Sequence, residues 1–230
     1  MNNISRLPVT FGLIGACVAV YVAVAVAGQS YGYPINFGLV TQPQEVLAQG
    51  ALLPASVAGG EAWLLVTSIF LHSGFIHLVL NMLSLYFLGS FVEEVFGGWR
   101  FAALYALSGL AGGIAYLYFG GAGPAVGASG AIFGLLGSIF GYTIRRGTFS
   151  WQNPLIRQLL ILTALNIYIG VSVDNISNTA HVGGLLGGLL FGYLSATTVY
   201  SRKGLHAATP TTIVLGLELI LLAIWILIIA

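Results

Sequence analysis

The stretch that organises this chain is residues 127–142, which read GASGAIFGLLGSIFGY. It contains Ser129, and small residues recur every four positions along it, at Gly130, Gly134 and Ser138 and again at Gly137 and Gly141. Small residues at this spacing allow helices in a membrane to approach one another closely. We therefore predict a short apolar helix that begins near Ser129, packs against another helix, and holds a hydroxyl group at membrane depth.

The composition places this helix in a membrane protein. Of the 230 residues, 58% are hydrophobic and only 6% are charged, whereas a soluble domain has about 25% charged residues. So few charges cannot cover a soluble surface, and the prediction is an all-α polytopic membrane protein. A net charge of +1 without a basic patch argues against a nucleic-acid partner, and the single cysteine, Cys17, excludes a disulfide framework or a cysteine metal site.

Hydrophobic runs predict seven membrane spans. They lie at residues 8–28, 75–97, 99–119, 129–144, 153–170, 179–200 and 211–230. Residues 29–74 differ, because they contain several prolines and polar residues, and they are predicted to form a long first loop. Within this loop, residues 63–71 have the composition of an amphipathic or partly embedded segment.

The positive charges indicate the orientation of the spans. If the N-terminus is cytoplasmic, every positive charge falls at a cytoplasmic end, namely Arg6, Arg100, Arg145, Arg146, Arg157, Arg202 and Lys203. The loops on the other side, at 29–74, 120–128 and 171–178, contain none. This distribution follows the positive-inside rule and predicts a cytoplasmic N-terminus.

Three polar residues fall at similar depths in spans that run from the outside inwards. Ser129 precedes Arg145 by sixteen residues, or about 24 Å at the rise of an α-helix. By the same rise, Asn81 lies about 24 Å and His181 about 31 Å from the cytoplasmic ends of their own spans. Since the hydrocarbon core is about 30 Å thick, all three are expected in its outer part.

Helical spacing groups these residues further. His77 and Asn81 are four residues apart and therefore share one helix face. His181 is followed on its own face by Gly184 and Gly188. The small faces of the fourth and sixth spans are predicted to pack together, which would bring Ser129 close to His181.

A serine beside a histidine suggests nucleophilic catalysis. A serine hydroxyl is a weak nucleophile until a base accepts its proton, and neutral histidine suits that task. The acid nearest in sequence to His181 on the outer side is Asp174, in the preceding loop, so we expect a Ser–His dyad without a carboxylate. His77, Asn81 and the backbone N–H of Ser129 are the candidate donors to an oxyanion.

Each residue also has a purely structural interpretation. Ser129 can bond to its own backbone, glycine faces usually serve packing, and His77 with Asn81 can form an interhelical pair. His72 is expected to bond to backbone groups of the loop, and Glu218 in the last span to be paired or protonated, because a charge in lipid is costly. The combination at one depth favours a functional site over these separate explanations.

Three motifs resemble those of the rhomboid family. Residues 72–81, HSGFIHLVLN, resemble its pattern of His, four residues, His, three residues and Asn. Residues 127–130, GASG, resemble its nucleophile motif, and residues 180–188, AHVGGLLGG, its base-bearing helix. The turn with Glu93, Gly98 and Arg100 is also similar. The GASG motif alone is a weak signal, but the three together are specific, and the resemblance extends over residues 60–200.

The resemblance implies an intramembrane serine endopeptidase. Ser129 would be the nucleophile, His181 the general base, and His77, Asn81 and the Ser129 N–H the oxyanion hole. The supporting residues would be Gly127, which keeps the segment before the serine open to substrate, with Gly130, Phe133, Gly184 and His72. The fifth span would act as a gate, and the loop 171–178 as a cap.

The resemblance also implies an architecture and a partner. Residues 1–200 would form a six-helix rhomboid-like catalytic domain, and residues 201–230 a cytoplasmic linker with an additional transmembrane helix. The protein would lie in a bacterial cytoplasmic membrane, with its site opening towards the outer side. Its partners would be the lipid bilayer and transmembrane protein substrates, unwound near their outer ends and with a small residue before the cut. No cofactor, metal or nucleic acid is expected.

Two positions depart from the common family pattern, and three other functions are alternatives. Trp63 is followed by Leu64 where many members have Trp-Arg, and Phe133 stands where many have tyrosine. The alternatives are a catalytically inactive rhomboid-like chaperone, a transporter, and a metal site formed by His72, His77 and His181. The presence of both Ser129 and His181 disfavours the first. No convincing internal repeat supports the second, and the third leaves the glycine-rich serine turn unexplained.

Overall fold

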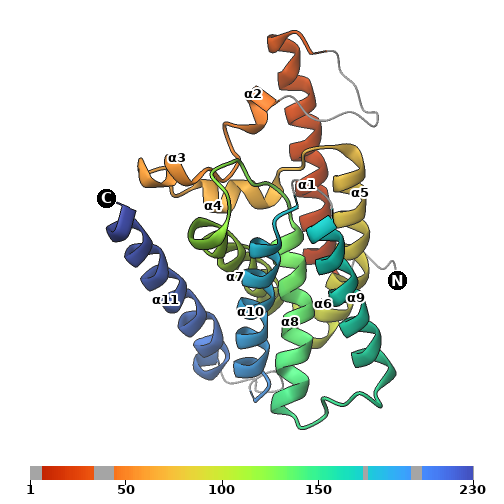
Figure 1. The fold of residues 1–230 in the computed structure, drawn as a ribbon. Coiled ribbons are helices and arrows are strands. Elements are labelled where there is room, and N and C mark those ends of the chain that lie inside the picture. Colours follow the sequence, from red (N-terminus) through yellow and green to blue (C-terminus); the bar gives the residue numbers. More distant parts are fainter. Residues whose placement is uncertain (1–6, 34–43, 173–175, 198–203, 230) are drawn as a thin grey trace.

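The chain folds into a bundle of helices in a computed structural model that describes residues 7–33, 44–172, 176–197 and 204–229 (Figure 1). Each predicted span corresponds to a helix. In chain order these are α1 (Pro8–Ala27), α5 (Phe75–Ser84) with α6 (Ser90–Phe96), α7 (Gly98–Phe119), α8 (Ser129–Arg145), α9 (Pro154–Ser172), α10 (Asn178–Ser195) and α11 (Gly204–Ile229). Only an isolated bridge between Leu52 and Ala125 has β character in the described residues. The prediction of an all-α polytopic membrane protein is confirmed.

The helices fall into two groups by length and composition. Five are long and apolar enough to cross a membrane, namely Pro8–Tyr31, Phe75–Phe96, Gly98–Phe119, Pro154–Ser172 and Thr209–Ile229. Helices α8 and α10 are not among them, with 17 and 18 residues and many glycines. Residues 130–141 of α8 are all buried, so α8 is surrounded by protein. A helix in that position needs neither the length nor the apolar surface of a span that faces lipid.

The predicted contact between the fourth and sixth spans is present as the packing of α8 on α10. A Cβ atom at Gly184 or Gly188 of α10 would overlap the carbonyl groups of Gly130 or Gly134 of α8. In the other direction, a Cβ atom at Gly137 would overlap the carbonyl of Leu185. The two backbones therefore touch without side chains between them, which fixes how the two helices lie against each other.

Glu93 of α6 is hydrogen-bonded to the start of α1. Its carboxylate accepts hydrogen bonds from the backbone N–H groups of Val9 at 3.1 Å and Thr10 at 2.8 Å, and from the Thr10 hydroxyl at 2.7 Å. These N–H groups have no acceptor within α1, and a negative charge is favourable at a helix N-terminus. Glu93, which is buried, therefore caps α1 from a different helix.

The first loop contains short helices and contacts the segment that leads into α8. These helices are η2 (Gly28–Tyr31), α2 (Gln44–Leu47), α3 (Pro54–Ala58), α4 (Leu64–Thr67) and η3 (Ser68–Phe70). Leu52 and Ala125 exchange two backbone hydrogen bonds of 2.9 Å, and Gly127 donates its N–H to the carbonyl of Ser68 at 2.9 Å. The first loop thus supports the turn before Ser129. Residues 63–71 include α4 and η3, with Trp63 exposed and Leu64 buried, as expected for an amphipathic segment.

One helix interior and one helix boundary differ from the predictions. The second span contains a π-helical turn, η4 (Leu85–Gly89), between α5 and α6. Helix α11 begins at Gly204, so the predicted linker is helical before residue 211, and Pro210 lies inside the helix. A proline removes one backbone hydrogen bond but does not force a helix to end, and Pro210 is almost fully buried.

Helix α11 lies at the edge of the bundle (Figure 1). It is attached to α7 by polar contacts. The Trp225 indole donates to the Leu117 carbonyl at 2.9 Å, and the Tyr118 hydroxyl donates to the Leu221 carbonyl at 2.7 Å. Glu218 is buried on the inner side, and neither of its carboxylate oxygens has a hydrogen-bond partner among the described residues. The pairing proposed for Glu218 from the sequence is therefore not observed there.

Candidate active site

Ser129 occupies the first position of α8, directly after a turn that requires glycine. Gly127 has φ of +127°, a conformation that side chains rarely adopt, and a Cβ atom there would lie 2.8 Å from the His77 ring. Ala128, which follows, is fully buried and sets the start of the helix. The N–H of Ser129 belongs to the first turn and has no acceptor within α8. The Ser129 N–H is therefore available to an acceptor from outside the helix.

His181 lies in the first turn of α10. The helix is capped by Ser177, whose hydroxyl accepts the N–H of Ala180 at 3.2 Å. His181 is 6% exposed, and its Nε2 atom lies 2.9 Å from the Ser129 Oγ atom. The Nδ1 atom of His181 has no hydrogen-bond partner among the described residues. Asp174, the acid nearest in sequence, lies outside those residues, so the expected dyad without a carboxylate stays a prediction.

Phe133 lies beneath the His181 ring. It is one helical turn after Ser129, so both side chains project from the same face of α8. The rings of Phe133 and His181 are stacked, with centroids 4.3 Å apart and an angle of 8° between their planes. Together with the backbone contact of Gly184 on Gly130 one turn below, this stack restricts the position of the imidazole.

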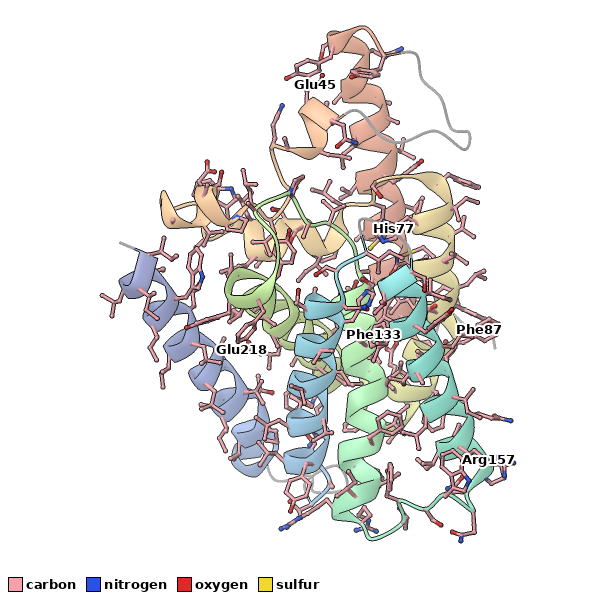
Figure 2. All side chains as sticks on the ribbon, viewed as in Figure 1. Glu45, His77, Phe87, Phe133, Arg157 and Glu218 are labelled. Carbon is pink, nitrogen blue, oxygen red and sulfur yellow. The ribbon has the colours of Figure 1, made fainter. Side chains whose placement is uncertain are left out.

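His77 approaches the site from α5 (Figure 2), and Asn81 lies one helical turn further along the same helix. The position of a Cβ at Gly127 is 2.8 Å from the His77 Nε2 atom and 3.9 Å from the Ser129 Oγ atom, so His77 lies just across the turn from the serine. Asn81 is buried, and its side-chain amide donates to the backbone carbonyl of His77 at 2.8 Å. That bond uses one of the two amide N–H groups and leaves the other for a further acceptor.

His72 lies beside His77, outside the membrane-spanning helices. Its ring is 1% exposed, and its Nδ1 atom is 3.3 Å from the Phe70 carbonyl, the kind of backbone contact predicted for it. The His72 and His77 rings meet edge to face with centroids 5.1 Å apart. Burial, with a smaller contribution from His77, lowers the pKa of His72 to about 3, so this ring is neutral.

One polar neighbour of the site was missed by reasoning from the sequence. The Ser73 hydroxyl lies 3.1 Å from the Nδ1 atom of His77. Ser73 precedes α5 and is four residues before His77, a spacing that could have been noticed. A metal site made from His72, His77 and His181 finds no support, since the described residues contain no group of three metal-ligating side chains.

The fold and site together define a class of protein. A serine and a buried histidine are hydrogen-bonded at the start of two short helices that pack backbone to backbone, in a bundle whose longer helices can cross a membrane. The Rhomboid domain family matches residues 59–198, more than half of the chain. The chain therefore belongs to the rhomboid family, which confirms the resemblance noted from its motifs.

Several relatives cover the same part of the chain. Rhomboid protease GluP of Bacillus subtilis (strain 168) is 37% identical over 148 residues, which are 64% of this chain and 29% of that protein. RHOMBOID-like protein 5 of Arabidopsis thaliana is 39% identical over 149 residues, 63% of this chain and 48% of that protein. Putative rhomboid protease YdcA of Bacillus subtilis (strain 168) is 37% identical over 146 residues, 60% and 69% of the two chains. The chain thus spans less than half the length of the first two relatives.

Proposed function

We propose that this protein is an intramembrane serine endopeptidase that cleaves transmembrane segments of other membrane proteins. The observation that carries this proposal is the 2.9 Å contact between the Ser129 Oγ atom and the His181 Nε2 atom. A nucleophile and a base within hydrogen-bonding reach form the minimal unit of acyl transfer. The names of two relatives, Rhomboid protease GluP and Putative rhomboid protease YdcA, support the same activity.

The reaction begins with proton transfer from Ser129 to His181. As the Nε2 atom accepts this proton, the Oγ atom forms a bond to the carbonyl carbon of the scissile peptide, and the carbonyl oxygen becomes an oxyanion. Protonated His181 then gives the proton to the departing amine as the C–N bond breaks. A water molecule releases the acyl group from Ser129 by the same two proton transfers in reverse.

The oxyanion is stabilised by donors on two elements. His77 of α5 faces Gly127 across the turn from Ser129, and Asn81 lies one helical turn after His77 on the same face, so both side chains and the Ser129 N–H are the proposed donors. Removing one such donor costs about 10²–10³ in kcat in other hydrolases. Phe133 stacks on His181 but cannot donate a hydrogen bond, so its contribution is to hold the ring in plane with Ser129.

The site opens towards the outer side of a bacterial cytoplasmic membrane in this proposal. The Arg145 end of α8 and Arg157 lie at the opposite end of the bundle from Glu45 of the first loop, and His77 lies nearer the Glu45 end (Figure 2). Positive charges at one end agree with a cytoplasmic face there. Arg6, Arg202 and Lys203 lie outside the described residues.

Activity-based labelling tests the function directly. A fluorophosphonate probe should label the purified wild-type protein in detergent. It should not label Ser129→Ala, and it should label His181→Ala more slowly than the wild type. Cleavage of a model single-pass substrate should be lost in the same variants and be insensitive to EDTA. Labelling of Ser129→Ala at another residue, with cleavage retained, would reject the assignment; intact folding with no labelling of the wild type would instead indicate an inactive relative.

Asn81→Ala tests the oxyanion donors separately. The expected result is a fall in kcat of about 10²-fold with a small change in KM, since the donor acts mainly on the transition state. A matched control is Asn166→Ala on α9, whose amide bonds only to its own helix at Leu162. An unchanged kcat for Asn81→Ala would remove Asn81 from the proposed oxyanion hole.

A further inference from the structure

The imidazole of His77 is held between two different environments. On one side its Nδ1 atom lies 3.1 Å from the Ser73 hydroxyl. On the other side its Cε1 and Nε2 atoms face Gly127, whose hypothetical Cβ would lie 2.8 Å from each of them. A neutral imidazole carries a proton on only one nitrogen, so the hydrogen bond at Nδ1 decides what Nε2 can do.

The two directions of the Ser73 hydrogen bond have opposite consequences. If Nδ1 donates to the Ser73 oxygen, Nε2 carries no proton and can only accept a hydrogen bond. If Ser73 donates to Nδ1, the proton resides on Nε2 and points towards the turn that precedes Ser129. Only the second arrangement places a donor where a negatively charged oxygen would form.

We propose that Ser73 is a positioning residue that donates to His77 and so keeps its Nε2–H available as an oxyanion donor. This inference rests on the proposed protease function, because it assigns Ser73 a role through His77. Ser73 itself does not touch the reacting atoms in this proposal.

The other described neighbours of His77 make no hydrogen bond to its ring nitrogens. Asn81 bonds to the backbone carbonyl of His77 rather than to its ring. His72 meets the ring of His77 edge to face, and its own Nδ1 atom is directed to Phe70. Among the described residues, the hydrogen bond from Ser73 is therefore the one that reaches the His77 imidazole.

Ser73 also links the tautomer to the local fold. It lies in the short segment between η3 and α5, where Gly74 has an extended backbone and α5 begins at Phe75. The Ser73 hydroxyl therefore contacts His77 in the first turn of α5, although Ser73 itself lies before the helix. Threonine keeps the hydroxyl group, whereas alanine removes it with little change in volume, so the two variants separate the hydrogen bond from packing.

The tautomer can be measured without any assay of activity. In purified protein with ¹⁵N-labelled histidine, the ring signals that disappear in His77→Gln belong to His77. We expect the wild type and Ser73→Thr to show a protonated Nε2 and an unprotonated Nδ1 at His77. Ser73→Ala should lose this preference. A protonated Nδ1 in the wild type, or an unchanged tautomer in Ser73→Ala, would overturn the proposal even if the protein is a protease.

A double-mutant cycle tests the catalytic consequence. Ser73→Ala should lower kcat about tenfold with little change in KM, the factor that one neutral hydrogen bond contributes. In a His77→Ala background, the same substitution should have no further effect, because its target is gone. Ser84→Ala in α5 is the matched control and should leave kcat unchanged in both backgrounds.

The outcomes are distinguishable from failure of the proposed function. An equal loss from Ser73→Ala in both backgrounds would show a structural role and overturn the inference. If Ser129→Ala still cleaved the substrate, the protease mechanism would be rejected, while the histidine spectra would still decide whether Ser73 sets the tautomer.

Discussion

Helices α8 and α10, which meet backbone to backbone, differ from the peripheral helix α11 in length, composition and packing. Helix α11 has 26 residues with an apolar surface around nearly its whole circumference, and only 17% of its most apolar window is buried within the protein. Helices α8 and α10 are shorter and rich in glycine, and residues 130–141 of α8 are all buried. Contact with lipid requires an apolar surface on α11. The small residues of α8 and α10 instead allow their backbones to touch, and this contact brings Ser129 and His181 together at the starts of the two helices.

This difference explains where polar chemistry can be placed. A hydroxyl and an imidazole exposed to lipid lack partners, which is costly in a bilayer. Ser129 and His181 are instead hydrogen-bonded to each other, and the His181 ring is buried within the bundle. The serine and the histidine thus lie on the two helices that are too short or too rich in glycine to be recognised as spans by their apolar character. Five substitutions test this difference between the helices.

Ser129→Ala has the largest expected effect. It should reduce peptide cleavage by about 10⁶-fold, as loss of the nucleophile does in other serine hydrolases, while the thermal unfolding temperature stays the same. The control is Ser138→Ala in the same helix, since that buried hydroxyl bonds to the Leu135 carbonyl and not to the site. Comparable losses of cleavage in both variants would mean that α8 tolerates no change of side chain and that the effect is not specific to Ser129.

Adding one methyl group should affect the stability of the protein differently in the two groups of helices. The two variants to compare are Gly184→Ala in α10 and Gly216→Ala in α11. The added methyl group at Gly184 would overlap the backbone of Gly130, which cannot move aside, whereas nothing lies within 4 Å of a Cβ at Gly216 in α11. We expect Gly184→Ala to lower the free energy of unfolding by about 3 kcal/mol or more, in the upper range of overpacked cores. Gly216→Ala should raise it by up to about 1 kcal/mol, because alanine is the better helix former.

Thermal unfolding in one detergent checks this pair. Equal stabilities of the two variants would contradict the backbone contact between α8 and α10. Cleavage measured well below the unfolding temperature should also fall in Gly184→Ala, since a shift of α10 moves His181 away from Ser129.

Phe133→Leu should have an intermediate effect. Leucine keeps apolar volume but removes the ring that stacks on His181, and such aromatic contacts contribute about 0.5–1.5 kcal/mol beyond buried area. We expect kcat to fall up to about tenfold with little change in KM. Phe140→Leu is the control in the same helix, because Phe140 contacts Phe149 near the other end of α8. A loss for Phe140→Leu equal to that for Phe133→Leu would argue against a role of the stack in orienting His181.

Glu218→Gln should have the smallest effect. Glu218 is 5% exposed, and its carboxylate oxygens have no hydrogen-bond partner among the described residues. Glutamine keeps the shape and cannot carry a charge, so the unfolding temperature should be unchanged or slightly higher and cleavage unaffected. A strong loss of stability would reveal a partner for the carboxylate and make α11 more than a peripheral helix.

Much of the site was predictable because its signals are local. The start of α8 at Ser129 follows from the glycine-rich turn, the shared face of His77 and Asn81 from a four-residue spacing, and the backbone contact of α8 with α10 from small residues at regular intervals. These features depend on a few neighbouring residues and on helix geometry. Boundaries were less predictable: the apolar run suggested a last span that begins at residue 211, but α11 begins at Gly204 and continues through Pro210.

The amino-acid sequence was sufficient for the membrane class, the order of the spans and the family, because hydrophobicity, motif spacing and helical period can all be followed along one chain. Tertiary structure decided which rings and hydroxyls meet. The stack of Phe133 on His181, the capping of α1 by Glu93 and the contact of Ser73 with His77 depend on side-chain directions and on loops that close over one another. Such contacts are fixed to within fractions of an ångström only when all the helices are packed, so no local pattern can specify them.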